Sequence, residues 1–398
     1  MATANPIPDV TPIPVQAETC LLVLLTAMPM EQLESVLTNL TDSFTPDSLL
    51  IAAPEALPKD SYAHLQFVSA PATRPSWTLT AADFVNAYQL AQKNNVRAIL
   101  MLGPGSDSLG LSALRDLASS VQANGSDLAI PCYDLPPHAG LLNSALLYPL
   151  SRALFASRAR FPLAIDLGLS MRMAERLCGV AQRLIGLNQS EAPLWPINEA
   201  VAAGYAIQEI DAGSRVMPQP SAPDLNTILP LVTASLFSDI EAKAAFWQRA
   251  RQLPSARRAV PTAPVPLTDA WAEIAPMLQA FRLAYNNLQG IWSLVLPPNA
   301  LLGLKRLYTT EAEAFRMPES LWARIVFDFV LAYRLRTINR GHLLGALIPL
   351  YRAWTAGHIN TIASGMNPEL HVEAVAAAFE AEKPYIVSRW RWPDRFNP

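Results

Sequence analysis

The chain has 398 residues, of which 51% are hydrophobic and 16% are charged, and its formal net charge is -3. This length and composition supply enough apolar material for two domains, or for one large α/β domain with a helical extension. Because the charges are of mixed sign and nearly balanced, nucleic acid and anionic membrane surfaces are excluded as expected partners.

The first residues are expected to form an extended, disordered arm. Residues 1–17 are rich in proline and polar side chains, and they lack the basic stretch of a signal peptide. The apolar run 20–28 is too short to span a bilayer. Cys20, Cys132 and Cys178 lie far apart without metal-site spacing, as is typical of reduced, buried thiols. We therefore expect a cytoplasmic protein without a membrane span.

Strand and helix patterns alternate over residues 18–256. Short apolar runs predict strands, and they are separated by segments whose apolar residues recur at helical spacing. The expected strands are 21–25, 48–52, 65–69, 96–102, 127–132 and 205–210. The expected helices are 29–40, 79–94 with Thr80 as its N-cap, 111–123, 141–159, 171–187 and 225–253, and residues 164–170 are expected to be irregular. The alternation predicts an α/β domain built on a largely parallel sheet.

Beyond a proline-rich segment the pattern becomes helical. Residues 257–266 contain three prolines and a basic pair, and they are the expected linker. Amphipathic helices are expected at 268–289, 299–307, 318–337, 343–357 and 371–388. They predict a packed all-helical domain over residues 267–398.

The strand expected at 96–102 ends abruptly in Gly103-Pro104-Gly105. It delivers the chain to the carboxyl edge of the sheet, where open α/β folds bind their ligands. Successive N–H groups of such a turn can cradle a phosphate, but Pro104 lacks an N–H and no lysine stands at P-loop spacing. A plain turn is therefore favoured.

Two adjoining segments carry distinctive sequence, residues 142–155 (LNSALLYPLSRALF) and 160–170 (RFPLAIDLGLS). Further distinctive segments are 315–318, 321–324, 339–344, 349–351 and 379–385. Together they resemble bacterial family-2-like glycosyltransferases of the GT-A fold, the group of mannosylglycerate synthase and glucosyl-3-phosphoglycerate synthase. The resemblance covers nearly the whole chain, and it implies a mixed GT-A sheet followed by a C-terminal helical domain. It also implies sugar transfer from a nucleotide-sugar to a small hydroxyl acceptor such as glycerate or phosphoglycerate, usually with a divalent metal.

The chain departs from the resembled family at the positions that bind the metal and the nucleotide-sugar. The family's Asp-x-Asp reads Gly103-Pro104-Gly105 here, and Asp107 replaces it only after a register shift. Its Gly-Gly-Asp reads Ala164-Ile165-Asp166. The other departures are Asn198 for an aspartate, Met217 for a histidine, Ser76-Trp77-Thr78 for a Gly-Lys-Gly turn and Ala53-Pro54-Glu55 for an acidic turn. Because Mg²⁺ and Mn²⁺ need oxygen ligands, chiefly carboxylates, we expect this metal site to be lost and predict no cofactor.

The candidate site residues follow from this resemblance. Asp166 and Glu199 are the candidate catalytic carboxylates. Asp166 could instead cap a helix or bind Arg158 or Arg160, and Glu199 could be a solvated first-turn residue. The candidates for binding the sugar donor or the acceptor are Gly103, Gly105, Asp107, Arg74, Arg160, Asn198, Arg215 and His342. His342 and His358 could instead be structural.

Three functions are compatible with these residues. The first is a GT-A homologue with little or no transferase activity. The second is an active, metal-independent glycosyltransferase in which Arg74, Arg160 and Arg215 neutralise the diphosphate. The third is an interaction subunit of an active paralogue. The expected partners are a nucleotide-sugar or a small hydroxyl acceptor, and a second copy of the chain or a paralogue.

Overall fold

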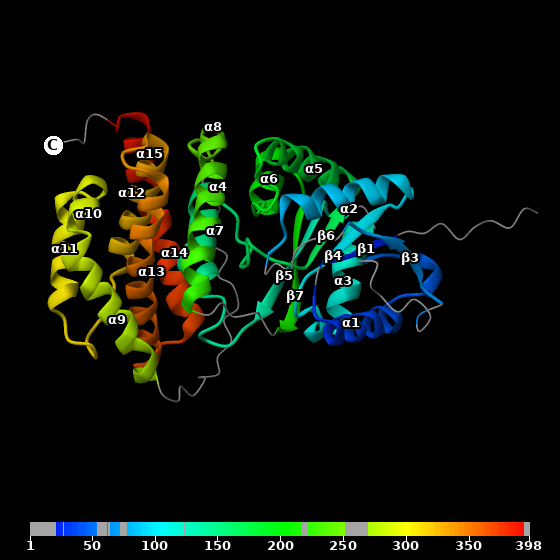
Figure 1. The fold of residues 1–398 in the computed structure, drawn as a ribbon, viewed down its shortest axis with the longest axis horizontal. Helices are drawn as coiled ribbons and strands as arrows, with labels where there is room; N and C mark the ends of the chain where they lie inside the picture. The colour runs from blue at the N-terminus through cyan, green and yellow to red at the C-terminus, as the bar shows by residue number, and fades with distance from the viewer. Residues whose placement is uncertain are drawn as a thin grey trace, which may run out of the picture.

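A computed structural model describes residues 21–26, 28–53, 62, 64–71, 78–122, 125–215, 222–250 and 270–393 of the protein. The expected arm 1–17 and linker 257–266 lie outside these residues. Figure 1 shows a twisted sheet with helices on both faces, and beside it a layer of long helices. The expectation of a mixed α/β sheet followed by an all-helical region is confirmed.

Seven described strands form the sheet in the order β3-β2-β1-β4-β6-β5-β7. They are β1 (Leu21–Leu25), β2 (Leu49–Ala53), β3 (Gln66–Ser69), β4 (Ala98–Leu102), β5 (Leu128–Asp134), β6 (Leu167–Ser170) and β7 (Ile207–Ser214). Strand β6 runs antiparallel to both β4 and β5, whereas the other described pairings are parallel. The expectation that residues 164–170 are irregular is therefore wrong for 167–170. A four-residue strand that contains a glycine has too little local pattern to be recognised.

Helices cover both faces of the sheet (Figure 1). One face carries α1 (Met30–Ser43) and α3 (Leu111–Gln122), and the other carries α2 (Ala81–Lys93), α5 (Met171–Gly186) and α6 (Pro196–Ala203). The predicted N-cap of α2 is confirmed, because the main-chain N–H of Thr80 donates to the Asp83 carboxylate over 2.8 Å in a capping box.

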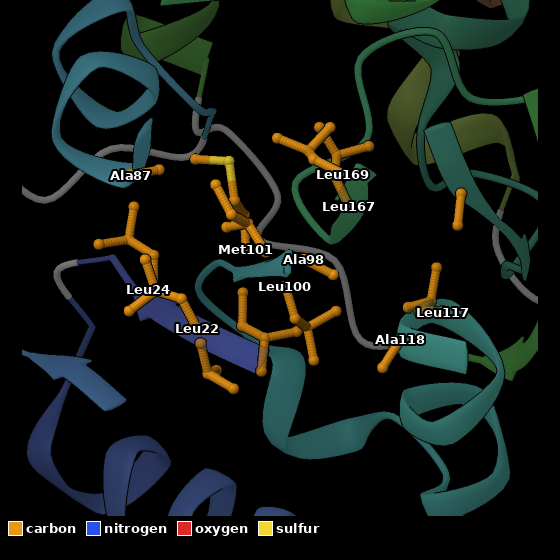
Figure 2. Close-up of a cluster of buried hydrophobic side chains, with 14 of the residues drawn as sticks. Leu22, Leu24, Ala87, Ala98, Leu100, Met101, Leu117, Ala118, Leu167 and Leu169 are labelled. Atoms are coloured by element: carbon orange, nitrogen blue, oxygen red, sulfur yellow. The ribbon is translucent and has the colours of Figure 1, made fainter. Parts of the chain in front are cut away.

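The core of this part lies between the central strands and their covering helices. Figure 2 shows Leu22 and Leu24 of β1 beside Leu100 and Met101 of β4, with α2 and α3 side chains above and below. All five residues of β4 are buried. A strand covered on both faces has to be apolar at every position, and this is why β1 and β4 read as unbroken apolar runs.

The second layer is built from helices that come from both sides of the expected linker. They are α4 (Tyr148–Phe155), α7 (Ala222–Ala242), α8 (Ala244–Trp247), α9 (Ala270–Asn287), α10 (Gln289–Val295), α11 (Pro298–Thr309), α12 (Glu319–Leu335), α13 (Arg340–Ala363), α14 (Pro368–Ala381) and α15 (Lys383–Arg391). One hydrophobic core joins Leu150 of α4 and Phe237 of α7 to Phe327 of α12 and Leu347 of α13. The single helix expected at 371–388 is divided between α14 and α15. None of the described helices combines the length and the apolar composition that crossing a bilayer requires.

Candidate functional site

The turn after β4 is a tight one, as predicted. Gly105 has a φ of 83°, in the left-handed region that favours glycine, and the Ser106 N–H donates to the Gly103 carbonyl over 3.1 Å. The N–H of Gly103 donates to Oδ1 of Asp166 over 3.3 Å, and the N–H of Gly105 donates to Oε1 of Gln32 over 3.1 Å. Both glycine N–H groups that could have faced a phosphate are therefore already engaged.

A buried ion pair lies against this turn. Asp166 precedes β6, Arg215 follows β7, and both side chains are 0% exposed. Nε and Nη2 of Arg215 each lie 2.9 Å from Oδ2 of Asp166, and Nη2 also donates to the Pro104 carbonyl over 3.0 Å. The Tyr133 hydroxyl donates to the same carboxylate oxygen over 2.7 Å. The alternative partners expected for Asp166, Arg158 and Arg160, are wrong, because its cation is Arg215.

The surroundings of Asp166 act on its protonation in opposite directions. Burial raises the pKa of this carboxyl group, and the Arg215 guanidinium, with the hydrogen bonds from Tyr133 and Gly103, opposes that shift. Arg215 is a predicted contact of the sugar donor or the acceptor, but its side chain is enclosed and bound to Asp166 and the β4 turn. Sequence reasoning named both residues without pairing them, because they are separated by 49 positions.

Two other candidates belong to a buried network that joins helices. Nδ2 of Asn198 donates to Asp239 of α7 over 2.9 Å. Glu199 forms ion pairs with Arg176 over 3.0 Å and with Lys243 over 2.6 Å, and Lys243 also contacts Asp239. The expectation of a solvated Glu199 is wrong, since the residue is 6% exposed. This network ties α6 to α5 and α7.

The remaining candidates are scattered. Asp107 lies in a short 3₁₀ turn after β4, and its Oδ1 atom is buried and has no hydrogen-bond partner in the part of the chain that the structure describes. His342 is exposed in the first turn of α13, 16 positions before His358, which is about 24 Å along the helix axis. Arg74 and Met217 lie outside the described residues. Among the described residues, no three His, Cys, Asp or Glu side chains are grouped so that they could hold a metal ion.

A cavity of about 600 Å³ opens where β5 and β7 end opposite α13 and α14. In Figure 1, β5 and β7 are the strands nearest to the helical layer. The walls of the cavity include Tyr133 and Asp134 of β5, Asp211 of β7, His358 of α13 and Glu369 of α14. Tyr133 connects this cavity to the buried Asp166, because its hydroxyl is bound there.

Arg160 is the predicted candidate that lines the cavity. Its Nε and Nη2 atoms donate to the Glu369 carboxylate over 3.0 and 2.9 Å, and Nη2 also reaches the Ser144 hydroxyl over 2.9 Å. The Arg160 main-chain N–H donates to Glu209 over 2.7 Å. Burial raises the pKa of the Glu209 carboxyl, and this hydrogen bond opposes that shift. Arg160 therefore links the loop before β6 to β7 through its main chain and to α14 through its guanidinium.

Two buried histidines lie at the helical side of the cavity, and His358 belongs to its wall. Nδ1 of His358 is 2.6 Å from Nδ1 of His371, and the His358 ring stacks on Trp354 with centroids 5.0 Å apart. The His358 ring also hydrogen-bonds to the main chain at Pro137, in the loop that lines the cavity. Burial, aided by His371, lowers the pKa of His358 to about 3. Sequence reasoning missed His371, since nothing local pairs two histidines on different helices.

Acid is expected to destabilise the protein through His358. Its pKa falls from the usual 6.5 to about 3, so between these values the unfolded chain binds a proton that the folded chain does not. The free energy of unfolding should therefore decrease by about 1.4 kcal/mol, from this group alone, for each unit that the pH falls through that window. Urea unfolding at several pH values measures the slope.

The matched variants for this test are His358→Gln and His342→Gln. The first removes the buried titrating group and should flatten the pH dependence of the free energy of unfolding. The second removes an exposed histidine of the same helix and should leave the slope as it is. Equal slopes in the two variants would contradict the assignment of the acid sensitivity to His358.

No family model matches the sequence, and no curated protein matches it. Among solved structures, glucosyl-3-phosphoglycerate synthase from Mycobacterium tuberculosis in complex with phosphoglyceric acid is 14% identical, with a TM-score of 0.37 over 64% of this chain and 85% of that chain. The same synthase with Mn²⁺, uridine-diphosphate-glucose and phosphoglyceric acid has a TM-score of 0.38 at 14% identity, over 57% and 81%. A mycobacterial protein also has a TM-score of 0.38 at 14% identity, over 56% and 76%. At this identity the likeness concerns the fold alone, and it assigns no function to any residue.

Proposed function

We propose that this protein is a GT-A glycosyltransferase homologue in which metal-dependent sugar transfer is lost or strongly reduced. The mixed sheet, the helical layer and the cavity at the carboxyl edge support the lineage. The observation that carries the proposal is the buried Arg215–Asp166 pair against Gly103-Pro104-Gly105. In the resembled enzymes this turn holds the carboxylates that bind the metal.

The residues at the β4 turn do not fit a divalent cation. Hard cations such as Mg²⁺ take about six oxygen ligands, with carboxylates foremost. Two aspartates lie at this turn. The oxygens of Asp166 are used by Arg215, Tyr133 and Gly103, which leaves Asp107 alone to offer carboxylate oxygens to an ion. A divalent ion there would also lie beside a guanidinium of the same sign, whose repulsion in a buried site is strong.

Metal-independent transfer would need cations that can reach a diphosphate. Of the three arginines predicted for this role, Arg74 lies outside the described residues, Arg215 is enclosed, and the Nε and Nη2 atoms of Arg160 are bound to Glu369. These engagements favour the impaired homologue over a metal-independent enzyme. A role as the interaction subunit of a paralogue, a cytoplasmic location and assembly with a second copy stay predictions.

The proposal is tested by a transfer assay on the full chain. UDP-glucose or a GDP-sugar is incubated with glycerate or phosphoglycerate, with Mg²⁺ or Mn²⁺, and release of the nucleoside diphosphate is followed. We expect release no faster than without protein, because a missing metal site removes several kcal/mol of the roughly 8–23 kcal/mol that enzymes supply. An active glucosyl-3-phosphoglycerate synthase serves as the positive control.

Steady release that depends on the metal would overturn the proposal. Release that persists in EDTA would instead establish the metal-independent enzyme. Thermal unfolding with UDP and Mn²⁺ adds a second readout. A ligand at about 100 times its Kd would stabilise the fold by about 2.7 kcal/mol, and we expect no such shift.

A further inference from the structure

Helices α12, α13 and α14 meet at the two buried histidines, which the proposed function does not use (Figure 1). His358 of α13 and His371 of α14 are 1% and 3% exposed, and their Nδ1 atoms lie 2.6 Å apart. A distance this short requires one proton between the two nitrogens, because two facing N–H groups would clash and two lone pairs would repel. One ring therefore donates from Nδ1, and the other accepts there.

The second nitrogen of each ring, Nε2, also faces an acceptor. The His358 ring hydrogen-bonds to the main chain at Pro137, and since proline has no N–H, its partner is the carbonyl oxygen. Nε2 of His371 lies 3.6 Å from Oε1 of Glu319, the first residue of α12. The contact with His371 lowers the pKa of the Glu319 carboxyl, so this group is ionised near neutral pH. Both Nε2 atoms therefore carry a proton.

The number of protons gives the charge of the pair. One proton lies between the rings and one on each Nε2 atom, which makes three protons on two imidazoles, whereas two neutral rings carry one each. The pair therefore holds one positive charge. His371 carries it, because His371 faces the Glu319 carboxylate, whereas Arg160 and His138 oppose a charge on His358, whose pKa burial lowers to about 3.

Glu319 is the partner of this charge, and its side chain is 42% exposed. The carboxylates of α14 itself are bound to arginines outside the pair, Glu369 to Arg160, and Glu373 and Glu380 to Arg152. The contact between Glu319 and His371 therefore joins α12 to α14 through the charge of the histidine pair.

We propose that the three-proton histidine pair is a pH-sensitive tie that holds α14, one wall of the cavity, against α12 and α13. As the pH rises, the pair loses its third proton, and the Nε2 lone pair of His371 then faces the Glu319 carboxylate. The contact changes from attraction to repulsion. The stability that the tie contributes is thus present while the pair holds three protons, and it is lost as the pH rises through the titration of the pair.

Histidine side-chain ¹⁵N NMR of the full chain, from about pH 5 to about pH 8, reads these protons directly, because bare and protonated ring nitrogens give separate signals. Spectra of His358→Gln and His371→Gln assign the signals. At the acid end we expect a bare Nδ1 on His358 and two protonated nitrogens on His371. Towards the alkaline end only the Nε2 signal of His371 should move to the bare position.

Glu319→Gln tests the partner of the charge. It changes a partly exposed side chain, so the fold should persist, and the Nε2 proton of His371 should leave at a pH lower by about half a unit. Glu313→Gln changes an exposed glutamate of the loop before α12 and should leave this titration unchanged.

Hydrogen exchange of the α14 amides, corrected for the intrinsic rate at each pH, measures the tie itself. In the unmodified chain, opening of α14 should become about two- to fivefold more frequent as the third proton is lost, and Glu319→Gln should remove this dependence.

Three results would overturn the proposal. They are a bare Nε2 on His371 at every pH, a second proton on His358 in place of His371, and the same pH dependence of α14 opening in the unmodified chain and in Glu319→Gln. These measurements need neither nucleotide-sugar nor acceptor, so their failure leaves the proposed function untouched. Sugar transfer in the assay above would overturn the proposed function and leave the histidine tie standing.

Discussion

Replacing Arg215 with methionine is expected to lower the free energy of unfolding by about 3–5 kcal/mol, because Asp166 would stay buried without its cation. Both side chains of the pair are fully enclosed, and the guanidinium also binds the Pro104 carbonyl over 3.0 Å. Urea unfolding followed by circular dichroism measures the change. Since whole domains are stable by only about 5–15 kcal/mol, the single variant can fail to fold.

The double variant Asp166→Leu with Arg215→Met keeps the test decisive. Replacing both members of a buried pair with apolar groups often leaves the stability nearly unchanged. We therefore expect the double variant to recover most of the free energy of unfolding that Arg215→Met loses. Arg172→Met is the matched control, because Arg172 is also paired with an aspartate but its side chain is 62% exposed. It should lower the stability far less than Arg215→Met does, because solvent screens an exposed pair. An equal effect of the two arginine variants would show that the β4 turn is open to water.

Replacing Gly168 with alanine is expected to lower the free energy of unfolding by about 3 kcal/mol, through overpacking. Gly168 lies in β6, opposite Leu100 of β4 and Ala129 of β5, and against α3. An added Cβ would lie 2.4 Å from the Leu117 carbonyl oxygen and 3.1 Å from Cβ of Ala129. The first of these contacts is with a backbone atom, so the clash can be removed only if α3 moves away from the sheet.

A glycine-to-alanine substitution at Gly179 is the control, and its expected effect on the free energy of unfolding has the opposite sign. Gly179 lies inside α5, and apart from the helix's own backbone no atom of the described residues would come within 4 Å of an added Cβ there. Because alanine favours a helix over glycine, Gly179→Ala should stabilise the protein by up to about 1 kcal/mol. A neutral Gly168→Ala would mean that β6 and α3 are not in close contact.

Much of the secondary structure could be predicted from local pattern. Strands β1 and β4 are unbroken apolar runs because both of their faces are buried, and no loop or exposed helix tolerates such a run. The capping box of Thr80 and Asp83 lies within four residues, so its sequence alone locates the start of α2. The plain turn at Gly103-Pro104-Gly105 also follows from residues that are adjacent in the chain.

Strand β6 could not be predicted in this way. Its four residues acquire a strand conformation only because β4 and β5 supply hydrogen bonds on both sides. Gly168 allows α3 to pack close to this strand, because a Cβ at that position would clash with the α3 backbone. The candidate site shows the same limit. Asp166 and Arg215 are 49 positions apart, and Arg160 and Glu369 are 209 apart.

The residues themselves therefore established that β4 ends in a glycine-proline-glycine turn. The fold established which charge lies against that turn, and that a cavity with an excess of carboxylates opens at the neighbouring strand ends. The physical reason is the separation along the chain over which each interaction acts. Propensity, capping and turn chemistry act within a few residues, whereas ion pairing and cavity shape depend on groups that only the packed sheet and helices bring together.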